Sequence, residues 1–242
     1  PIIWFKAPHD GRYRVQIHDS KFWGLQNHIY RLTFKRGPHI LHSYPLGAQR
    51  GTTVQAEFSG PGLPKQKAAV SLIGVKEDRH IASLKKLGVV SFVIGDHPEQ
   101  LESKKSTAKT PVILNGRINN PGETDTWLIN LTENQDILLD LAAAQLDSPL
   151  DAVLSIYDAE GKQLATNDDR AKSQPDPRLD FTAKTTGIYT IKIHDRFASR
   201  GGPTFAYRLT VKARPKAKPD FTLALAVTHF NIIRANEPPK ED

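Results

Sequence analysis

The chain contains no cysteine and no methionine among its 242 residues. Without cysteine, a disulfide framework, a thiolate nucleophile and a cysteine-ligated metal are all excluded. Long apolar runs are missing too, since no stretch approaches the roughly 20 residues that a membrane span needs. The sequence does not start with an initiator methionine. We therefore expect a fragment or a processed product of a longer protein.

Enzyme signatures are also lacking. The sequence has no Gly-x-Ser-x-Gly elbow and no glycine-rich phosphate loop between a strand and a helix. It also lacks the alternation of strand and helix patterns that would support such sites. We therefore predict that the chain is not an enzyme and assign no catalytic residue.

The composition is that of a globular protein, with 38% hydrophobic and 24% charged residues and a net charge of +7. A positive balance can attract nucleic acid or anionic polymers. Here the basic residues are scattered over expected junctions and linkers: Lys35-Arg36, Lys65 and Lys67, Lys85-Lys86, Lys104-Lys105, and Arg214 to Lys218. We interpret them as solvated charges and expect no nucleic-acid partner.

An internal repeat is the most informative feature that is present. Residues Phe5–Asp19 and Tyr30–Lys35 return as Phe181–Asp195 and Tyr207–Lys212, in the same order and with one inserted residue near Gly201. Such a match indicates one structural unit present twice. The second copy has a long N-terminal half, from about residue 111, and the first copy has none. We therefore expect the chain to begin inside a module.

Alternating apolar residues predict strands throughout. Tyr13, Val15 and Ile17 occupy every second position, as a strand with one buried face requires, and Tyr189, Ile191 and Ile193 repeat the pattern. The segment Asp136–Leu146 contains strong helix formers, but its apolar residues also alternate. We favour a strand leading into a loop there.

Turn signals complete this prediction. A glycine two residues before a tyrosine, as in Gly11-Arg-Tyr13 and Gly187-Ile-Tyr189, allows a sharp turn before the strand. The tyrosine ring can then lie in the core while its hydroxyl bonds back to the loop. Residues 153–165 predict a hairpin with Gly161 at its turn. The predicted fold class is all-β, with tandem β-sandwich modules that are jelly-roll-like and immunoglobulin-like.

Five segments follow from these patterns. We predict the C-terminal part of a first sandwich over 1–37, a small immunoglobulin-like sandwich over 38–97 and a lysine-rich linker over 98–110. A complete sandwich then covers 111–213, and 214–242 forms a linker and the start of a further β module. Tandem sandwiches joined by short proline-containing linkers form a semi-rigid rod.

Several phrases in residues 111–212 resemble the bacterial pre-peptidase C-terminal (PPC) domain, in the variety found in exported proteins of planctomycete-type bacteria. These phrases are Asn115-Gly-Arg-Ile118, Pro121-Gly-Glu-Thr-Asp125-Thr-Trp127, Leu146-Asp-Ser-Pro-Leu-Asp151, Asn167-Asp168-Asp169, Gly187-Ile-Tyr189, and Gly201-Gly-Pro-Thr-Phe-Ala-Tyr207. Residues 1–36 resemble the last third of the same domain, and residues 44–94 weakly resemble an IPT/TIG module. The likeness covers most of the chain.

The resemblance implies a jelly-roll-like sandwich of secreted or cell-surface proteins, often beside peptidases or other hydrolases and usually non-catalytic. Some relatives bind calcium, and a few bind collagen or other extracellular polymers. The acidic motif that often precedes the domain is degraded here to His97-Pro-Glu-Gln-Leu-Glu102. That departure argues against a metal site that uses this segment.

Calcium is the sharpest chemical hypothesis. It takes about six to eight oxygen ligands, mostly from carboxylates and loop carbonyls. The candidate ligands are Asp125, Asp168, Asp169 and Asp176, all at predicted strand ends. The alternative is that these aspartates cap turns, a common role for the residue.

Aromatic loop residues are the candidates for ligand binding. Phe22 and Trp23 in the first copy, and Phe197 in the second, follow the repeated aspartate in a loop where a ring can stack on a sugar or a partner. The alternative is that these rings cover the end of the core. The repeated pairs His18-Asp19 and His194-Asp195 are not predicted to be catalytic, because adjacent strand residues point to opposite faces.

The sequence thus predicts a non-catalytic, extracellular or cell-surface β-sandwich array that is a structural spacer or an adhesion module, with Ca²⁺ as a candidate stabilising ion. The alternative is a polysaccharide- or protein-binding accessory region of a secreted hydrolase or peptidase. Expected partners are other modules of a longer parent chain, neighbouring copies, or an extracellular polysaccharide or protein. The expected location is secreted, periplasmic or at the cell surface.

Overall fold

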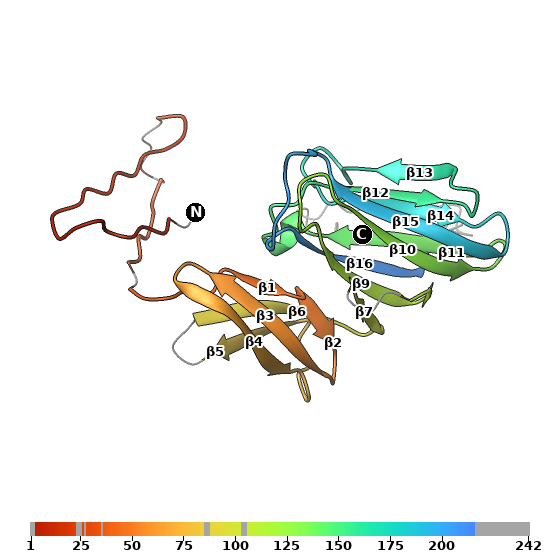
Figure 1. Ribbon diagram of the computed structural model, residues 1–242, viewed down its shortest axis with the longest axis horizontal. Helices are drawn as coiled ribbons and strands as arrows, with labels where there is room; N and C mark the ends of the chain where they lie inside the picture. Colours follow the sequence, from red (N-terminus) through yellow and green to blue (C-terminus); the bar gives the residue numbers. More distant parts are fainter. Residues whose placement is uncertain are drawn as a thin grey trace, which may run out of the picture.

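Two β-sandwiches follow one another in the computed structural model of the chain (Figure 1). The structure describes residues 3–22, 26, 28–34, 36–84, 88–102 and 106–215. The all-β fold class with tandem sandwiches is confirmed, and the regular helical element in this part of the chain is a short 3-10 turn, η2 (Ala144–Leu146). No helix here is long and apolar enough to cross a membrane.

The smaller sandwich consists of two three-stranded sheets with the orders β1-β3-β4 and β2-β6-β5. Its strands are β1 (His42–Tyr44), β2 (Gly47–Gln49), β3 (Thr53–Gly60), β4 (Leu63–Ser71), β5 (Arg79–Leu84) and β6 (Gly88–Gly95). Phe58 and Phe92, one from each sheet, meet edge to face in the core with ring centroids 6.2 Å apart. This aromatic pair joins the two layers.

The larger sandwich consists of two five-stranded sheets with the orders β13-β12-β15-β10-β8 and β14-β11-β16-β9-β7. Its strands are β7 (Glu99–Leu101), β8 (Ala108–Lys109), β9 (Val112–Arg117), β10 (Thr124–Leu131), β11 (Asp136–Ala142), β12 (Ala152–Tyr157), β13 (Gln163–Asn167), β14 (Arg178–Thr182), β15 (Gly187–Asp195) and β16 (Ala206–Ala213). A single buried core lies between the two sheets.

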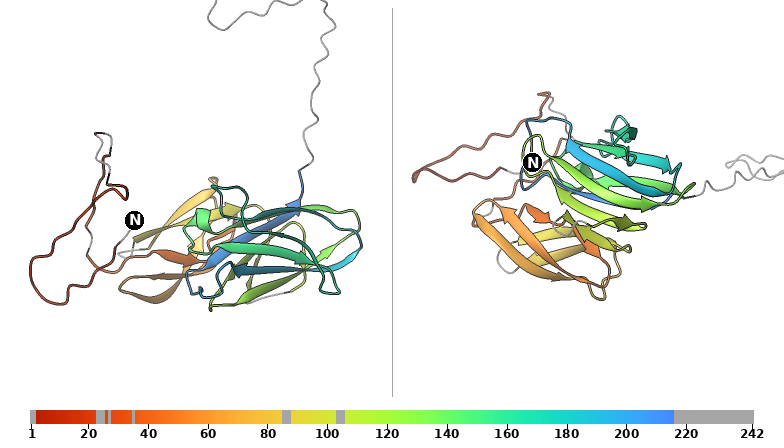
Figure 2. Two further views of the ribbon diagram at one scale, coloured as in Figure 1. Left: turned by 90° about the horizontal axis from the view of Figure 1, so that it is seen from above. Right: turned by 45° about the vertical axis from the view of Figure 1, so that its right-hand side comes forward.

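The burial of each strand follows its sequence pattern. In β10, Trp127, Ile129 and Leu131 are buried and the residues between them are exposed, as expected for a strand with one face on the core. In β9 five of six residues are buried, and in β16 the run Ala206–Leu209 is buried without interruption. These two strands have a second covered face, because the smaller sandwich lies against them (Figures 1 and 2).

Several local predictions are confirmed. Residues 136–142 form the strand β11, which leads into η2 and a loop instead of a helix. β12 and β13 form the predicted hairpin, with Gly161 at a positive φ of 83° in its turn. The Tyr189 hydroxyl donates to the Thr185 carbonyl oxygen at 2.9 Å, which is the predicted corner contact.

The predicted linker over 98–110 is corrected by the structure. Residues 99–101 form β7, which pairs in parallel with β9, and residues 108–109 form β8, which pairs in parallel with β10. Neither strand could be recognised from alternation, because each is only two or three residues long and lies at a sheet edge. The larger sandwich therefore begins near Glu99 and not at residue 111.

The first copy of the repeat also differs from expectation. Its described residues between 3 and 34 contain no strand, and the segment extends away from both sandwiches (Figure 1 and the left view of Figure 2). Strands were expected at residues 13–17 and 30–34. Strands need hydrogen-bonding partners, and the described residues provide this segment with no counterpart of the neighbours that the second copy finds in β9 to β12. Most of the predicted final module, residues 216–242, lies outside the described residues.

Candidate functional site

A buried ion pair lies where the two sandwiches meet. Arg208 of β16 faces Glu99 of β7, with its Nη1 and Nη2 atoms 2.7 and 2.6 Å from the two Glu99 carboxylate oxygens. The Asn115 side-chain nitrogen donates to the same carboxylate at 2.9 Å. Only 4% of the Arg208 side chain and 11% of the Glu99 side chain is exposed. A bidentate pair of this kind fixes both orientation and distance.

Two glycines of the smaller sandwich leave room for this arginine. A Cβ atom added to Gly47 would lie 2.9 Å from Arg208 Nη1, and one added to Gly95 would lie 2.7 Å from Arg208 Nη2. The backbone of β2 and β6 therefore lies directly against the guanidinium group. We call the contact of Arg208, Glu99 and Asn115 with these glycines the module seam.

The seam continues through a tyrosine and a second arginine. The Tyr44 hydroxyl donates to the Asn115 carbonyl oxygen at 2.9 Å, and the Arg117 guanidinium lies over the Tyr44 ring at 4.0 Å. Arg117 also forms an ion pair with Glu57 of β3 at 2.9 Å. Burial, followed by the nearby Glu102 carboxylate, raises the pKa of Tyr44 to about 12. The hydroxyl therefore remains a hydrogen-bond donor at physiological pH.

Three carboxylates form a cluster beside the seam. Glu102, at the end of β7, lies with Glu123 and Asp125 so that one oxygen of each is within 4.8 Å of the others. Backbone donors orient two of these carboxylates: the Arg117 N–H donates to Glu102 at 3.1 Å, and the Asn120 N–H donates to Glu123 at 2.7 Å. We call Glu102, Glu123 and Asp125 the acidic cluster.

A buried hydrogen-bond chain positions the third member of this cluster. Trp127 Nε1 donates to the Tyr207 hydroxyl at 2.7 Å, and that hydroxyl donates to Asp125 Oδ2 at 2.6 Å. Complete burial, followed by the Asp125 charge, raises the pKa of Tyr207 well above its usual value. Gly116 makes the approach feasible, because a Cβ atom there would lie 2.2 Å from the Tyr207 oxygen and 2.7 Å from Asp125 Oδ2.

The acidic cluster has the chemistry of a hard-cation site. Three carboxylates converge, and calcium prefers carboxylate and carbonyl oxygens as ligands. Like charges this close repel one another, and a divalent cation between them would remove that repulsion. The residues therefore fit calcium, with the remaining ligands to come from backbone carbonyls or water.

The other predicted calcium ligands lie elsewhere. Asp168 and Asp169 lie near Arg196, whose Nη1 is 3.1 Å and 4.0 Å from their carboxylates. Asp176 accepts the backbone N–H groups of Ala144 and Gln145 at 2.8 and 3.0 Å, and so caps η2. The structure thus brings Asp125 together with two glutamates and does not bring it together with these three aspartates.

The aromatic candidates occupy exposed positions. Half of the Phe197 surface is exposed, and the Arg200 guanidinium lies over its ring at 4.8 Å. Phe22 is also exposed and stacks on the His18 ring with centroids 4.8 Å apart. Trp23 lies outside the described residues. Ligand binding by these side chains stays a prediction.

The His194-Asp195 pair has a structural arrangement. The Asp195 carboxylate accepts hydrogen bonds from Arg200 and from the backbone N–H groups of Phe197 and Asp151. Burial would raise the pKa of Asp195, but these hydrogen bonds outweigh it and lower the pKa. The His194 Nδ1 atom contacts the Asp195 carbonyl oxygen and not its carboxylate. Asp195 therefore organises the loop that follows β15.

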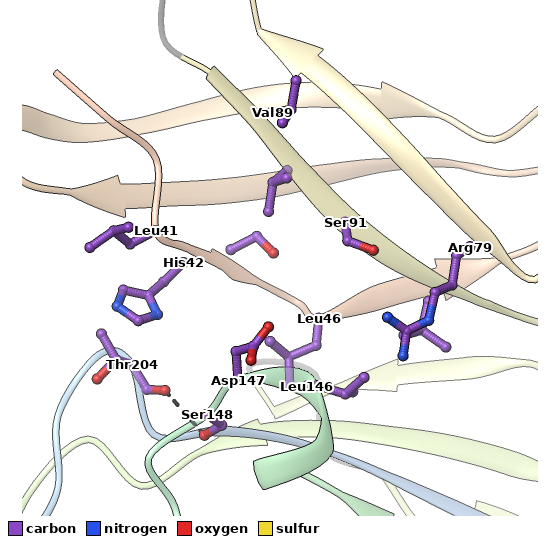
Figure 3. A pocket seen from close by; sticks show the side chains of 13 residues that line it. Leu41, His42, Leu46, Arg79, Val89, Ser91, Leu146, Asp147, Ser148 and Thr204 are labelled. Carbon is purple, nitrogen blue, oxygen red and sulfur yellow. Dashed lines mark hydrogen bonds between the residues drawn. The ribbon is translucent and has the colours of Figure 1, made fainter. Parts of the chain in front are cut away.

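A small cavity lies between the sandwiches (Figure 3). It has a volume of about 210 Å³ and is lined by residues from β1, β5, β6 and the loops around η2 and Thr204. His42 lies toward one end, Arg79 toward the other and Asp147 between them. Burial lowers the pKa of His42, and Asp147 opposes this shift in part.

Glu102 and Glu123 are not among the calcium ligands that the sequence predicts. Glu102 belongs to a motif that departs from the resembled family, and Glu123 lies in a turn where an acidic residue is common. A usable signal was present, since Glu123 is two residues before the buried Asp125 and strand neighbours at that spacing share a face. Only the pairing of β7 with β9 brings Glu102 beside them.

Comparisons with known proteins give distant structural likenesses only. No protein-family profile and no curated protein sequence matches the chain. Among solved structures, the chain is similar to the pre-peptidase C-terminal domain of a Bacillus anthracis collagenase, at 16% identity, over 49% of this chain and 100% of that one, with a TM-score of 0.35. The Aeromonas hydrophila inhibitor PliG, a periplasmic inhibitor of g-type lysozyme, matches at 12% identity over 48% and 99% of the two chains, with a TM-score of 0.35.

A third similar structure contains the CBM51-2 and INT domains of Clostridium perfringens ZmpB, in complex with GlcNAc. It matches at 11% identity over 72% of this chain and 40% of that one, with a TM-score of 0.27. Identities and TM-scores this low assign neither a family nor a ligand. The PPC and IPT/TIG likenesses remain resemblances.

Proposed function

We propose that this chain is a non-catalytic spacer segment of an exported bacterial protein, in which two sandwiches form one stiff unit that carries or presents another activity. The observation that supports this proposal is the module seam. Its hydrogen bonds and ion pairs are buried and directional, so they favour one relative orientation of the sandwiches. Because the seam fixes the orientation of one sandwich relative to the other, it also fixes where an attached domain lies. A flexible linker would not do so.

Pulsed electron paramagnetic resonance tests this stiffness directly. The chain has no cysteine, so spin labels at Gln55→Cys on β3 and Asn130→Cys on β10 would report one distance between the sandwiches. We expect a narrow distance distribution, comparable to that of a control pair within the larger sandwich, Asn130→Cys with Asp180→Cys. Replacing Tyr44 and Arg117 by alanine should broaden the first distribution and leave the control unchanged.

A broad distribution between the sandwiches in the unaltered background would contradict the spacer proposal. The thermal unfolding of each labelled variant must match that of the parent chain, so that broadening reports loss of the seam and not loss of folding. A narrow distribution that survives loss of both Tyr44 and Arg117 would place the rigidity in Arg208 and Glu99 alone.

Calcium is the proposed stabilising ion of this unit. Glu102, Glu123 and Asp125 would hold it, and the ion would supply the positive charge that these carboxylates share. Glu102 directly follows β7, and the backbone N–H of Arg117 in β9 donates a hydrogen bond to its carboxylate. An ion bound there would hold β7, where the larger sandwich begins, against β9 and so would stabilise the seam.

A second proposal is that the loop after β15 binds an extracellular polysaccharide or protein. It is favoured by the exposed ring of Phe197, which Asp195 and Arg200 hold in position. An aromatic ring held rigidly at the surface loses little entropy when it stacks on a ligand. The chain would then be an accessory region that keeps an attached hydrolase near its substrate.

A further inference from the structure

The second copy of the repeat shows which strands this sequence pattern forms when it is part of a sandwich. Its two strands, β15 and β16, lie in different sheets of the larger sandwich. β15 pairs with β10 and β12, and β16 pairs with β9 and β11. The repeat therefore encodes one internal strand from each of two facing sheets. Two such strands pack face to face and cannot form a sheet by themselves.

The first copy repeats an aromatic contact of the second. Phe5 and Tyr13 meet edge to face with centroids 5.1 Å apart and an interplanar angle of 65°. Phe181 and Tyr189 meet in the same way at 5.6 Å and 69°. The two pairs occupy equivalent positions in the repeat, although only the second is buried in a sandwich.

The corner before the strand is repeated as well. The Tyr13 hydroxyl donates to the His9 carbonyl oxygen at 2.5 Å, and the Tyr189 hydroxyl donates to the Thr185 carbonyl oxygen at 2.9 Å. Both hydrogen bonds join a tyrosine to the residue four positions earlier. Residues 9–13 therefore form the same corner as the one that precedes β15 in the second copy, although they are followed by no described strand.

The end of the strand shows the same correspondence. The His18 Nδ1 atom contacts the Asp19 carbonyl oxygen at 3.0 Å, and His194 contacts the Asp195 carbonyl oxygen at 2.9 Å. Each aspartate also accepts the backbone N–H two residues later through its side chain, at 2.8 Å in both copies. Both ends of the strand are therefore preformed in the first copy.

The two copies differ in burial. Tyr13, Val15 and Ile17 are 45 to 55% exposed, whereas their counterparts in β15 are at most 3% exposed. Tyr30, Leu32 and Phe34 are likewise exposed, whereas their counterparts in β16 are fully buried. Exposure of an alternating apolar face along this whole segment marks an interaction surface.

We propose that residues 5–34 supply the two central strands of another sandwich, by pairing with a polypeptide segment outside these 242 residues that has the strand pattern of residues 111–182. That segment would supply the counterparts of β9 to β12 and of β14. Its sheets would have an apolar inner face and one unfilled strand position each, equivalent to those of β15 and β16. A second copy of this chain does not fit, because its own β15 and β16 already fill both places. This proposal goes beyond the spacer function and does not depend on it.

Grafting within the full chain provides the test. Residues 181–195 are replaced by residues 5–19, a segment of equal length. In a second variant residues 207–212 are replaced by residues 30–35, which amounts to the single substitution Val211→Phe because the two segments are otherwise identical. The second graft retains the arginine of the seam, since Arg31 matches Arg208. We expect both variants to unfold cooperatively and to keep the near-ultraviolet circular dichroism of the buried Trp127.

A matched control carries the first graft with the residues that correspond to Val15 and Ile17 changed to asparagine. This control should lose cooperative unfolding, because the inward face is then polar. If the control folds as well as the graft, the apolar face does not specify the strand and the proposal is wrong.

A measurement on the unaltered chain covers the case in which a graft fails to fold. The probe is a polypeptide of residues 106–182, which contains β8 to β14 without β15 and β16. We expect a one-to-one complex and at least tenfold slower amide exchange over residues 12–18, both lost in the Val15→Asn, Ile17→Asn chain. Failure of both grafts together with no protection by the probe would overturn the proposal. The proposal would also be wrong if the chain alone formed a dimer in which amide exchange over residues 12–18 was slowed without the probe.

Discussion

Arg208 and Glu99 form a bidentate ion pair, at 2.6 and 2.7 Å, between β16 and β7, the strands on either side of β9 in one sheet, and the backbone of the smaller sandwich covers it. The residues are separated by more than one hundred positions in the chain. Their pairing joins the segment that leaves the smaller sandwich to an internal strand of the larger one. This ion pair therefore fixes the segment between the two sandwiches at the module seam.

Removing one partner of this pair should be costly. We expect Glu99→Ala to lower the free energy of unfolding by about 3–5 kcal/mol, because it leaves the Arg208 charge buried without its carboxylate. The double variant Glu99→Met, Arg208→Met should lose less, since neither charge then remains. Urea unfolding followed by tryptophan fluorescence measures both values.

The surface ion pair between Arg50 and Asp78 is the matched control for this prediction. The Asp78 side chain is 91% exposed, so Asp78→Ala should change the unfolding midpoint far less than Glu99→Ala. A Glu99→Ala variant as stable as Asp78→Ala would show that water or another group compensates the buried arginine.

Calcium should stabilise the folded chain through the acidic cluster. At a calcium concentration of about one hundred times Kd, binding to the folded state alone adds about 2.7 kcal/mol to the free energy of unfolding. Glu123→Gln should remove most of the difference between melting in calcium and melting in chelator, because one carboxylate of three is lost. Calorimetry in the two buffers measures this difference.

Two controls separate this site from the other acidic positions. Glu133→Gln changes an exposed glutamate outside the cluster and should leave the calcium effect intact. The double variant Asp168→Asn, Asp169→Asn should also keep it. Loss of the effect in that double variant would instead place the ion beside Arg196, as the first hypothesis from the sequence had it.

Stability should fall as the pH decreases below neutrality because of His42. Burial lowers the pKa of this histidine from its usual value of about 6.5, with Asp147 opposing the shift in part. Between the two pKa values the unfolded chain binds the proton and the folded chain does not, so the stability contribution is present above about pH 6.5 and is lost below it.

Melting temperatures of the parent chain and of His42→Gln, measured from pH 7.5 to 5.0, test this prediction. The variant should lose less stability over that range than the parent does. His28→Gln, at an exposed position, should behave like the parent. A variant curve parallel to the parent curve would assign the pH dependence to other groups.

Phe197→Ala should distinguish a binding role from a structural one. Because half of the ring is exposed, we expect the free energy of unfolding to change by no more than about 0.5 kcal/mol. Retention on insoluble polysaccharides or on collagen, measured by co-sedimentation, should fall at least tenfold if the ring binds them. A clear loss of stability would instead show that the ring covers the end of the core.

The strands of the larger sandwich could be predicted because each needs only a local pattern. Alternation in β11 and β15 was recognisable in the sequence, and the corner at Tyr189 follows from a glycine two residues earlier. β7 and β8 escaped prediction, because a strand of two or three residues has no period to detect. Residues 98–110 therefore resembled a linker, although their ends pair with β9 and β10.

The sequence by itself determined the all-β class, the repeat and the apolar faces of its strands, since periodicity and spacing are local properties of a chain. Only the tertiary structure decided which distant charges meet. Glu102 comes beside Asp125, and Glu99 beside Arg208, through strand pairing between segments far apart in the sequence. It also decided that the same strand pattern is buried at Tyr189 and exposed at Tyr13, because burial depends on neighbouring strands and not on the pattern alone.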